Sequence, residues 1–529
     1  MKVRRDAPPM RLSPCLLFLL VFDAGAADSS ACAGCHAGIW RQWRDTPMAR
    51  SSGVAGEARI ETFGKAAFSN ARGTAQYSVS PKFTLRFAQA GVEGERALNY
   101  FLGAGNTGRS YLTSVDGFFF QAPVAYYRAR AAWDLSPGYE RAEEVNLARE
   151  TGPGCLRCHV TGLRPVEGAS NGFSAPPWRE NGVGCERCHG GGEDHIRGNQ
   201  SAIVNPAKLT GEARDSVCAQ CHLPGAVEIA KAGNAPPYVP GARLSDSVAI
   251  FVLAGEDREA NINGHFEQLS RSLCMRSSGG KLWCGTCHRV HATTSAKEKP
   301  AFYRQQCLAC HAEKPCTAAT SVRAAKGDDC VACHMTQRAS ETVQHAAVTD
   351  HRIPRLPRAP SRAAVNASLT PFGGEQADDR ELGLAYASVA LQENNRAWGL
   401  RAFELLRKES AANPRDAKVA SSLAQLYDRM NRDEDACRLY ETAVGLDPNA
   451  AAAKVNLAAC RAKQGKVDEA LALWSEVLKL NPSMETARLN YAVALFRTGR
   501  KNEAKASLNE ALRFNPASRR ARELLAGLQ

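Results

Sequence analysis

One short pattern dominates the chemistry available to this chain: two cysteines separated by two residues, with a histidine directly after the second cysteine. The pattern occurs seven times, at Cys32/Cys35/His36, Cys155/Cys158/His159, Cys185/Cys188/His189, Cys218/Cys221/His222, Cys284/Cys287/His288, Cys307/Cys310/His311 and Cys330/Cys333/His334. Two thioether bonds to the vinyl groups of a haem, with the adjacent imidazole on the iron, account for this spacing. A zinc site gives no reason to place histidine at that position each time.

Histidine makes up only 12 of 529 residues, so its recurrence after every cysteine pair is not a coincidence. The pattern predicts seven covalent haem c groups, held by the fourteen motif cysteines, with the seven motif histidines as proximal iron ligands. The last three motifs recur every 23 residues, from Cys284 to Cys307 to Cys330, which predicts closely packed haems. Electron transfer is the chemistry that such an array supports.

Each iron also accepts a sixth ligand, and the supply is limited. Outside the motifs lie five histidines, His195, His265, His291, His345 and His351, and the methionines considered are Met48, Met275 and Met335. His195 and His291 are too close to their own motifs to bind the same iron comfortably, so we expect them to bind neighbouring haems. Met48 is the favoured thioether ligand, and it would raise the potential of its haem. Five histidines and Met48 leave one iron of seven five-coordinate, where a substrate could bind.

The N-terminus has the pattern of an export signal. Lys2, Arg4, Arg5 and Arg11 precede a short apolar run from Cys15 to Phe22, and small residues at 24–27 offer a cleavage site. We therefore expect residues 1–27 to be removed and the rest to be periplasmic or otherwise secreted, with no membrane span. The formal net charge is +13, but haem propionates would offset most of it, so nucleic acid is not an expected partner.

The order of motifs and breaks predicts two parts. Residues 28–354 are expected to form a multihaem domain, mostly loops and helices around stacked haems. Alternating aromatic runs within about 60–140 predict a small β-rich insert there, and Val248–Ala254 reads as a buried strand. Residues 355–379 are rich in Pro, Ala, Ser and Gly and read as a linker.

A 34-residue repeat follows the linker. Pro414, Pro448, Pro482 and Pro516 keep this period, as do Ala402, Ala436, Ala470 and Ala504. Small residues at a helix crossing and proline at the end of a helix pair are typical of tetratricopeptide repeats. Residues 380–529 are thus expected to form an all-α solenoid with units at 383–416, 417–450, 451–484 and 485–518 and a capping helix at 519–529.

The segment from Cys185 to His195 resembles the Cys-x-x-Cys-His-Gly-Pro-Gly-x-x-His signature of the cytochrome c-552/4 family, although Gly191 replaces the usual proline. The segment from Trp283 to His291 resembles the Cys-His-x-Pro-His element of that group. The resemblance extends from about Ala31 to Pro354. It implies distal-ligand roles for His195 and His291 and, by position, for His265, His345 and His351. The whole arrangement resembles bacterial multihaem cytochromes with a tetratricopeptide tail.

Five cysteines lie outside the motifs. Cys15 belongs to the expected signal, and Cys437 and Cys460 occupy helix-core positions that favour packing over a bridge. Cys274 and Cys316 flank two motifs, and a disulfide between them is left open.

Three functions are compatible with these observations. The leading hypothesis is an electron carrier that docks to a protein partner through its repeats and exchanges electrons with a redox partner. The first alternative is a nitrite-reducing or hydroxylamine-oxidising enzyme with one five-coordinate haem, which the retention of histidine in every motif weakens. The second alternative is a repeat scaffold with redox-sensing haems. No catalytic residue is assigned.

Overall fold

The computed structural model describes residues 27–233, 235–254, 264–313, 316–338, 348–356, 368–374 and 377–528. His345, nearly all of the expected signal segment and much of the expected linker lie outside these residues. Among the residues described, no helix is long and apolar enough to span a membrane.

Two antiparallel sheets form the first part of the chain. One has the strand order β1-β6-β7-β8-β9 and the other β2-β3-β4-β5. Their bounds are β1 Ser52–Val54, β2 Ala67–Ser69, β3 Ala75–Val79, β4 Thr84–Gln89, β5 Val92–Ala97, β6 Tyr100–Leu102, β7 Gly108–Val115, β8 Phe118–Tyr127 and β9 Ala132–Leu135. Asp116 and Gly117, both at positive φ, make the two-residue turn between β7 and β8, a conformation that suits the twist of a hairpin.

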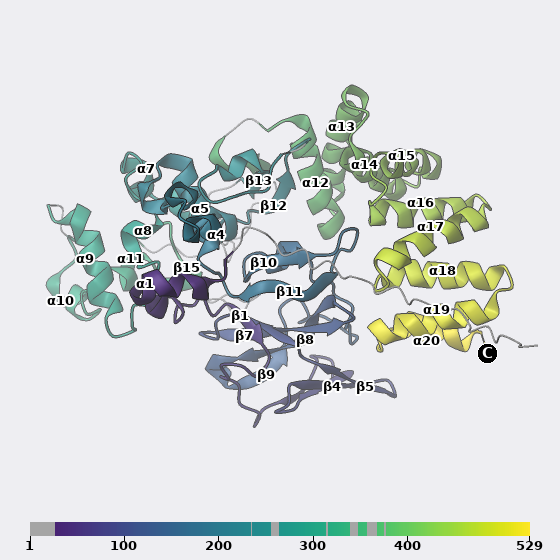
Figure 1. Ribbon diagram of the computed structural model, residues 1–529, viewed down its shortest axis with the longest axis horizontal. Coiled ribbons are helices and arrows are strands. Elements are labelled where there is room, and N and C mark those ends of the chain that lie inside the picture. The colour runs from purple at the N-terminus through teal and green to yellow at the C-terminus, as the bar shows by residue number, and fades with distance from the viewer. Residues whose placement is uncertain are drawn as a thin grey trace, which may run out of the picture.

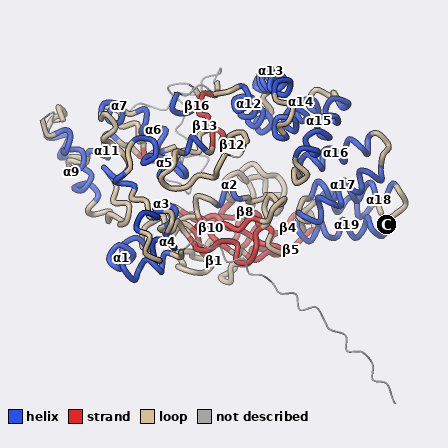
Figure 2. The backbone as a smooth tube through the Cα atoms, turned by 45° about the horizontal axis from the view of Figure 1, so that its top comes forward, coloured by secondary structure: helices blue, strands red, loops and turns tan. Residues whose placement is uncertain are grey.

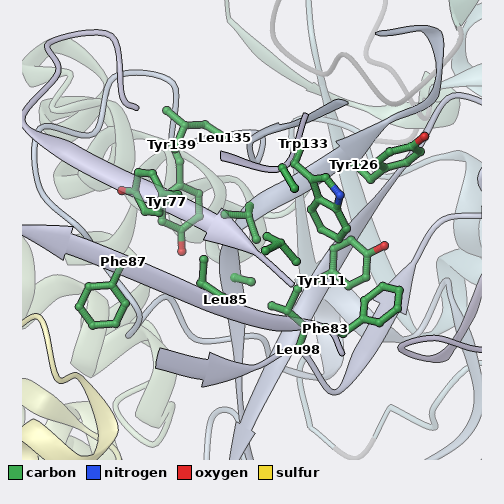
Figure 3. Packing of buried hydrophobic residues seen from close by; sticks show 14 of the residues in the cluster. Tyr77, Phe83, Leu85, Phe87, Leu98, Tyr111, Tyr126, Trp133, Leu135 and Tyr139 are labelled. Carbon is green, nitrogen blue, oxygen red and sulfur yellow. The ribbon is translucent and has the colours of Figure 1, made fainter. Parts of the chain in front are cut away.

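Aromatic side chains fill the space between these sheets (Figure 3). Tyr77, Leu85, Tyr111 and Trp133 are all at most 3% exposed. The buried carboxylate of Glu61 lies in the same region. It accepts hydrogen bonds from Tyr111 Oη at 2.7 Å and from Arg109 Nη1 at 3.0 Å. A buried charge is costly without partners, so the Glu61–Arg109 ion pair fixes the loop before β2 against β7.

A β-hairpin leads from this module to the next segment. It consists of β10 (Val160–Pro165) and β11 (Phe173–Asn181), which pair antiparallel. A three-stranded sheet follows, with the order β12 (Val227–Ala230), β13 (Val248–Leu253) and β16 (Leu369–Pro371). The strand expected at Val248–Ala254 is therefore present, and four of its residues are buried. A short pair, β14 (Gln337–Arg338) with β15 (Val348–Thr349), completes the strands described.

Eleven α-helices, most of them short, carry the cysteine motifs or lie beside them among the residues described. They are α1 Ser29–Trp43, α2 Pro153–Leu156, α3 Glu186–His189, α4 Gly192–Ile196, α5 Gly211–His222, α6 His265–Arg271, α7 Leu273–Ser277, α8 Cys284–Cys287, α9 Lys299–His311, α10 Thr320–Ala324 and α11 Cys330–His334. The expectation of mostly loops and helices was too narrow: the N-terminal region is rich in β-structure, because the sheets extend over 52–135 and recur at 160–181 and 227–253.

The C-terminal region is all-helical, as the repeat predicts. Its helices are α12 Asp379–Glu393, α13 Arg396–Ala412, α14 Ala417–Arg429, α15 Asp433–Leu446, α16 Ala451–Lys463, α17 Val467–Leu480, α18 Glu485–Arg497, α19 Lys501–Phe514 and α20 Arg519–Ala526. Asn431, Gly465 and Gly499 adopt positive φ in the turn inside successive helix pairs, which favours glycine or asparagine. The second helix of each pair ends two residues before the periodic proline.

The helical region follows one side of the molecule as an arc, and α9 and α10 lie at the opposite end (Figure 1). It is docked onto the N-terminal part. Arg96 Nη2 donates to the carbonyl of Phe514 at 3.0 Å, and Arg513 pairs with Asp116 at 2.7 Å. At the other end of the arc, Lys231 Nζ donates to Glu381 Oε2 at 3.1 Å.

The structure corrects the assignment of the isolated cysteines. Cys437 in α15 and Cys460 in α16 form a disulfide, although packing alone was expected of them. Both lie in the core between adjacent helix pairs, where their side chains meet. Cys274 and Cys316 remain free thiols, so the bridge left open between them is not formed.

We expect Cys437→Ala/Cys460→Ala to lower the free energy of unfolding of the helical region by about 3 kcal/mol, because the bridge closes a loop in the unfolded chain. Urea unfolding followed by far-ultraviolet circular dichroism measures this loss. Cys316→Ala, which removes an exposed free thiol, is the matched control and should leave the midpoint unchanged. Equal midpoints for both variants would contradict the bridge.

Candidate functional site

Four of the seven cysteine motifs lie at the ends of helices. His189, His222, His311 and His334 are the last residues of α3, α5, α9 and α11. In a helix, residues three and four positions apart share a face. Both cysteines and the histidine of these four motifs therefore face the same side, which is the arrangement that two thioethers and one axial ligand require.

Residues inside the motifs hydrogen-bond one motif to another. Arg187, between the cysteines of the third motif, donates to the carbonyl of Arg157 in the second motif at 3.1 Å. Gln220, inside the fourth motif, donates to the carbonyl of Arg187 at 2.9 Å. Ser29 Oγ at the start of α1 accepts from the amide of Cys185 at 2.9 Å. Sequence reasoning missed these residues because it treated the two positions between the cysteines as variable.

Contacts between thiols connect the same motifs and extend the series. The thiol of Cys32 donates to Cys185, and burial together with this neighbour raises its pKa to about 12. Similar contacts run from Cys158 to Cys221, from Cys218 to Cys284 and from Cys307 to Cys330. Every motif thus has a cysteine against another motif.

Three other predicted attachment residues, Cys35, Cys310 and Cys333, are not the cysteines that make these thiol contacts. Each is the second cysteine of its motif and a free thiol; Cys35 and Cys310 are exposed, and Cys333 is half-buried. In each of these three motifs the first cysteine makes the thiol contact. Cys32 of the first motif contacts Cys185, and Cys307 of the sixth motif contacts Cys330 of the seventh.

The structure does not bring Cys35, Cys310 or Cys333 against another motif through these contacts. In the second motif the roles are reversed, because Cys155 is exposed and Cys158 makes the contact. Attachment of haem at these three positions stays a prediction, which rests on the sequence pattern.

Imidazole rings from distant segments lie opposite the motif histidines. The ring centroids of His36 and His195 are 6.5 Å apart, and those of His189 and His291 are 5.9 Å apart. With iron–nitrogen bonds of about 2.0 Å and about 1.2 Å from each nitrogen to its ring centre, two imidazoles on opposite sides of one iron have centroids about 6.4 Å apart. Both pairs match this spacing, with ring planes within 16° of parallel.

Four further imidazoles gather between the fourth and fifth motifs. His288 and His351 have ring centroids 6.3 Å apart, which also fits one iron. His222 and His265 lie 5.3 Å apart. Their Nδ1 atoms are separated by 3.2 Å. Two nitrogens that bind the same iron from opposite sides are about 4 Å apart. The two rings would therefore have to rotate before both could bind one iron.

Protonation of these rings is compatible with metal ligation. Burial, reinforced by the nearby His351, lowers the pKa of His265 to about 3 and that of His288 to about 4. Both rings are therefore neutral at neutral pH, which leaves a nitrogen lone pair for iron.

Backbone carbonyls orient other rings. His189 Nδ1 lies 2.7 Å from the carbonyl of Val204, His334 Nδ1 lies 3.0 Å from that of Pro354, and His351 Nδ1 lies 2.9 Å from that of Thr349. A nitrogen that faces a carbonyl oxygen carries the proton, so Nε2 of each ring is left to bind a metal.

The structure brings only some of the expected ligands together. Within the described part of the chain, no ring contact pairs His159, His311 or His334 with a second imidazole. Met48 is half-buried in the turn after α1, where its carbonyl accepts from the amide of Val183 at 2.9 Å. Val183 lies two residues before the third motif, and the carbonyl of Ser51, three residues after Met48, is 3.3 Å from Nδ1 of His159 in the second motif.

The segment that carries the last three motifs has no hydrophobic core of its own. No hydrophobic side chain among the described residues of 270–356 is buried, whereas Leu273, Val322 and Leu356 are 69%, 56% and 74% exposed. An apolar planar group attached at these cysteines would cover such side chains. The donor set, the ring spacing and this uncovered apolar surface all fit covalently bound haem.

Comparison with known proteins agrees with this geometry. A family model described as cytochrome c554 and c-prime matches residues 125–190, which include the second and third motifs. Two tetratricopeptide repeat models match 421–485 and 461–528. The chain joins a cytochrome c554-type segment to tetratricopeptide repeats. A cytochrome c segment implies covalent haem c, and the repeats imply binding to a protein.

No curated protein matches this chain. Among solved structures, the crystal structure of MamA protein matches at 16% identity and a TM-score of 0.25, over 28% of this chain and 80% of that chain. MamA AMB-1 matches at 24% and 0.26, over 29% and 86%. The first tetratricopeptide repeat domain of Spaghetti, bound to an HSP90 peptide, matches at 21% and 0.21, over 21% and 89%.

Because the described residues of the lobe 270–356 bury no hydrophobic side chain, we expect this lobe to need its haems to stay folded. Cys307→Ala/Cys310→Ala, which prevents one attachment, should lose amide hydrogen-exchange protection in α9 and α11. The repeats should keep theirs. Cys274→Ala, which removes a free thiol in α7, is the matched control. Full protection of α9 without attachment would show that the lobe does not depend on the cofactor.

Proposed function

We propose that this chain is a secreted electron-transfer protein with seven c-type haems, held against a protein partner by its repeats. The carrying observation is the spacing of the imidazole pairs. Three of them, His36 with His195, His189 with His291, and His288 with His351, lie 5.9–6.5 Å apart, as two ligands of one iron would. When bound, haem c supplies one-electron redox chemistry at its iron.

The residues of the chain have three tasks in this proposal. The three imidazole pairs would each hold one iron and exclude a substrate from it. The hydrogen bonds of Arg187 and Gln220 keep three attachment motifs adjacent. The packing of Cys218 beside Cys284 and of Cys307 beside Cys330 places further motifs next to each other, where each sulfur would carry its haem. Fixed ligands and adjacent motifs suit the passage of electrons.

The repeats would supply the partner surface. Their inter-repeat loops at Asn481 and Phe514 already contact the N-terminal part of this chain. Helix α18 presents Phe496, which is 46% exposed. Figure 2 shows the row of paired helices at one end of the molecule, away from α9 and α11. A partner bound by the repeats would thus leave the α9–α11 end free for a second redox protein.

Two features support an extracytoplasmic location. Covalent haem attachment is expected after export, and the Cys437–Cys460 disulfide is stable in an oxidising compartment. The basic and apolar pattern of residues 1–27 accords with this location, as a cleaved signal would.

An enzymatic role is the second candidate, and one observation favours it. His159, His311 and His334 lack an imidazole partner among the residues described, so one of their irons could bind a substrate such as nitrite or hydroxylamine. Retention of histidine in all seven motifs favours the carrier instead.

Intact mass and electron paramagnetic resonance of the purified protein distinguish these candidates. We expect the mass to show seven haems and the resonance to be dominated by low-spin iron, with signals indifferent to nitrite, hydroxylamine and carbon monoxide. A high-spin signal that shifts with any of these ligands would replace the pure carrier with the enzyme. A smaller haem number would reject the seven attachments.

The ligand pairs can be tested one at a time. His291→Ala should convert one haem, that of the third motif, from low to high spin without changing the haem count, because its iron loses the ring opposite His189. His195→Ala should convert a different haem. Arg289→Ala, an exposed neighbour of His291, is the control and should leave every signal in place. If His291→Ala leaves all signals low-spin, the pairing is wrong.

A further inference from the structure

The loop that joins β10 to β11 ends in a buried polar network with the repeats. Asn171, in this loop, and Asn481, directly after α17, are both 0% exposed, and Ser483 is 3% exposed. Asn481 Nδ2 donates to Ser170 Oγ at 3.1 Å and to Asn171 Oδ1 at 3.4 Å. Ser483 Oγ lies 2.7 Å from Asn481 Oδ1 and 3.2 Å from Asn171 Oδ1, so its one proton is shared between these two oxygens. Because these groups are buried and satisfied together, they allow one orientation of the hairpin on the repeats.

The same asparagine is tied to the β-sheet module. Asn171 Nδ2 donates to the carbonyl of Phe119 at 3.1 Å, and the amide of Phe119 donates to the carbonyl of Asn171 at 2.8 Å. The ring of Phe119 packs on Phe173 in β11, with centroids 5.3 Å apart. Both rings belong to a core cluster that includes Leu156. Leu156 lies between Cys155 and Cys158 and is 0% exposed, so the second motif is part of this core.

The other end of the hairpin is fixed to the second and third motifs. Val160 follows His159 directly and is 1% exposed. Thr161 Oγ1 donates to the carbonyl of Gly182 at 2.9 Å and accepts from the amide of Gly184, next to Cys185, at 2.7 Å. The hairpin therefore runs from the repeats to two haem-attachment motifs, with a buried hydrogen-bond network at one end and a hydrophobic core at the other.

We propose that Asn171 and Asn481 are positioning residues for the second and third haem-attachment motifs, acting through the β10–β11 hairpin. The proposal rests on the proposed function in that these motifs hold haems. The third repeat then has a role besides partner binding. The loop after α17, which carries Asn481, fixes the position of Leu156 through the hairpin and thereby the orientation of His159.

Asn481→Asp is the sharpest variant, because it keeps the shape of the side chain and replaces its donor by a carboxylate. That carboxylate would keep the amide and hydroxyl donors of Ser483 on one oxygen, but its other oxygen would face the acceptor Asn171 Oδ1. A buried charge against an acceptor is strongly unfavourable. Ser483→Ala is the milder variant, since it removes a single hydrogen bond. Asn449→Ala is the control: Asn449 Nδ2 contacts Glu167 Oε1 on the same hairpin loop at 2.9 Å, but both side chains are exposed.

The experiment measures electron paramagnetic resonance and hydrogen exchange on the intact haem-loaded chain. Cys155→Ala/Cys158→Ala identifies the second-motif signal by difference, and His291→Ala identifies that of the third. We expect Asn481→Asp, and to a smaller extent Ser483→Ala, to shift these signals and to raise exchange in 160–181. The other haem signals should stay in place, and Asn449→Ala should match the unmodified chain.

Each other outcome is decisive. Unchanged signals in Asn481→Asp and Ser483→Ala, with all haems attached, would overturn the positioning role. Equal shifts of every haem signal would also overturn it, because they would indicate general loosening. A wild-type chain with fewer haems would reject the heptahaem proposal, while a shift confined to the second-motif signal would still support the role of the hairpin.

Discussion

The absence of buried hydrophobic side chains in the described residues of 270–356 is the constraint on which the rest of the N-terminal region depends. A lobe of this kind cannot offset its conformational entropy by side-chain burial alone. The attachment motifs therefore need support from outside the lobe. It comes from α5, whose Arg214 lies over the ring of Trp283 at 5.6 Å, and from Gln268, which accepts from the amide of His351 at 2.9 Å.

The β-sheet module and the repeats, in contrast to the lobe 270–356, bury many hydrophobic side chains. The β-sheet module is held by aromatic packing around Tyr111 and Trp133, whose ring centroids lie 4.9 Å apart, and by the buried Glu61–Arg109 pair. The repeats are held by small residues at helix crossings, such as Ala436 and Ala470, which are both 0% exposed. These parts fold by side-chain packing and so provide rigid supports beside a lobe that does not.

Much of this could be predicted from residue spacing, and the limits have physical causes. The repeat was readable because Pro448, Pro482 and Pro516 end helices at a fixed period, and helix packing in such units is local. Histidine counting predicts a set of candidate axial ligands but not which rings meet: His36 meets a ring 159 residues away in His195, and only tertiary packing decides that. The Cys437–Cys460 bridge was missed because core spacing fits packing and bridging equally well. Two cysteines in adjacent helices, both in the core, were the available signal.

The placement of the hairpin follows from these differences in folding. The second motif shares a hydrophobic core with the hairpin through Leu156, and a strand pair is stiffer than a loop of the same length, so the hairpin can set the direction of its histidine. Val160 begins its strand directly after His159, so the ring and the hairpin share backbone. The buried Asn171–Asn481 contact then makes the repeats part of the frame around the second motif. In such a frame, the surface that holds a partner and the surface that orients an imidazole belong to the same rigid body.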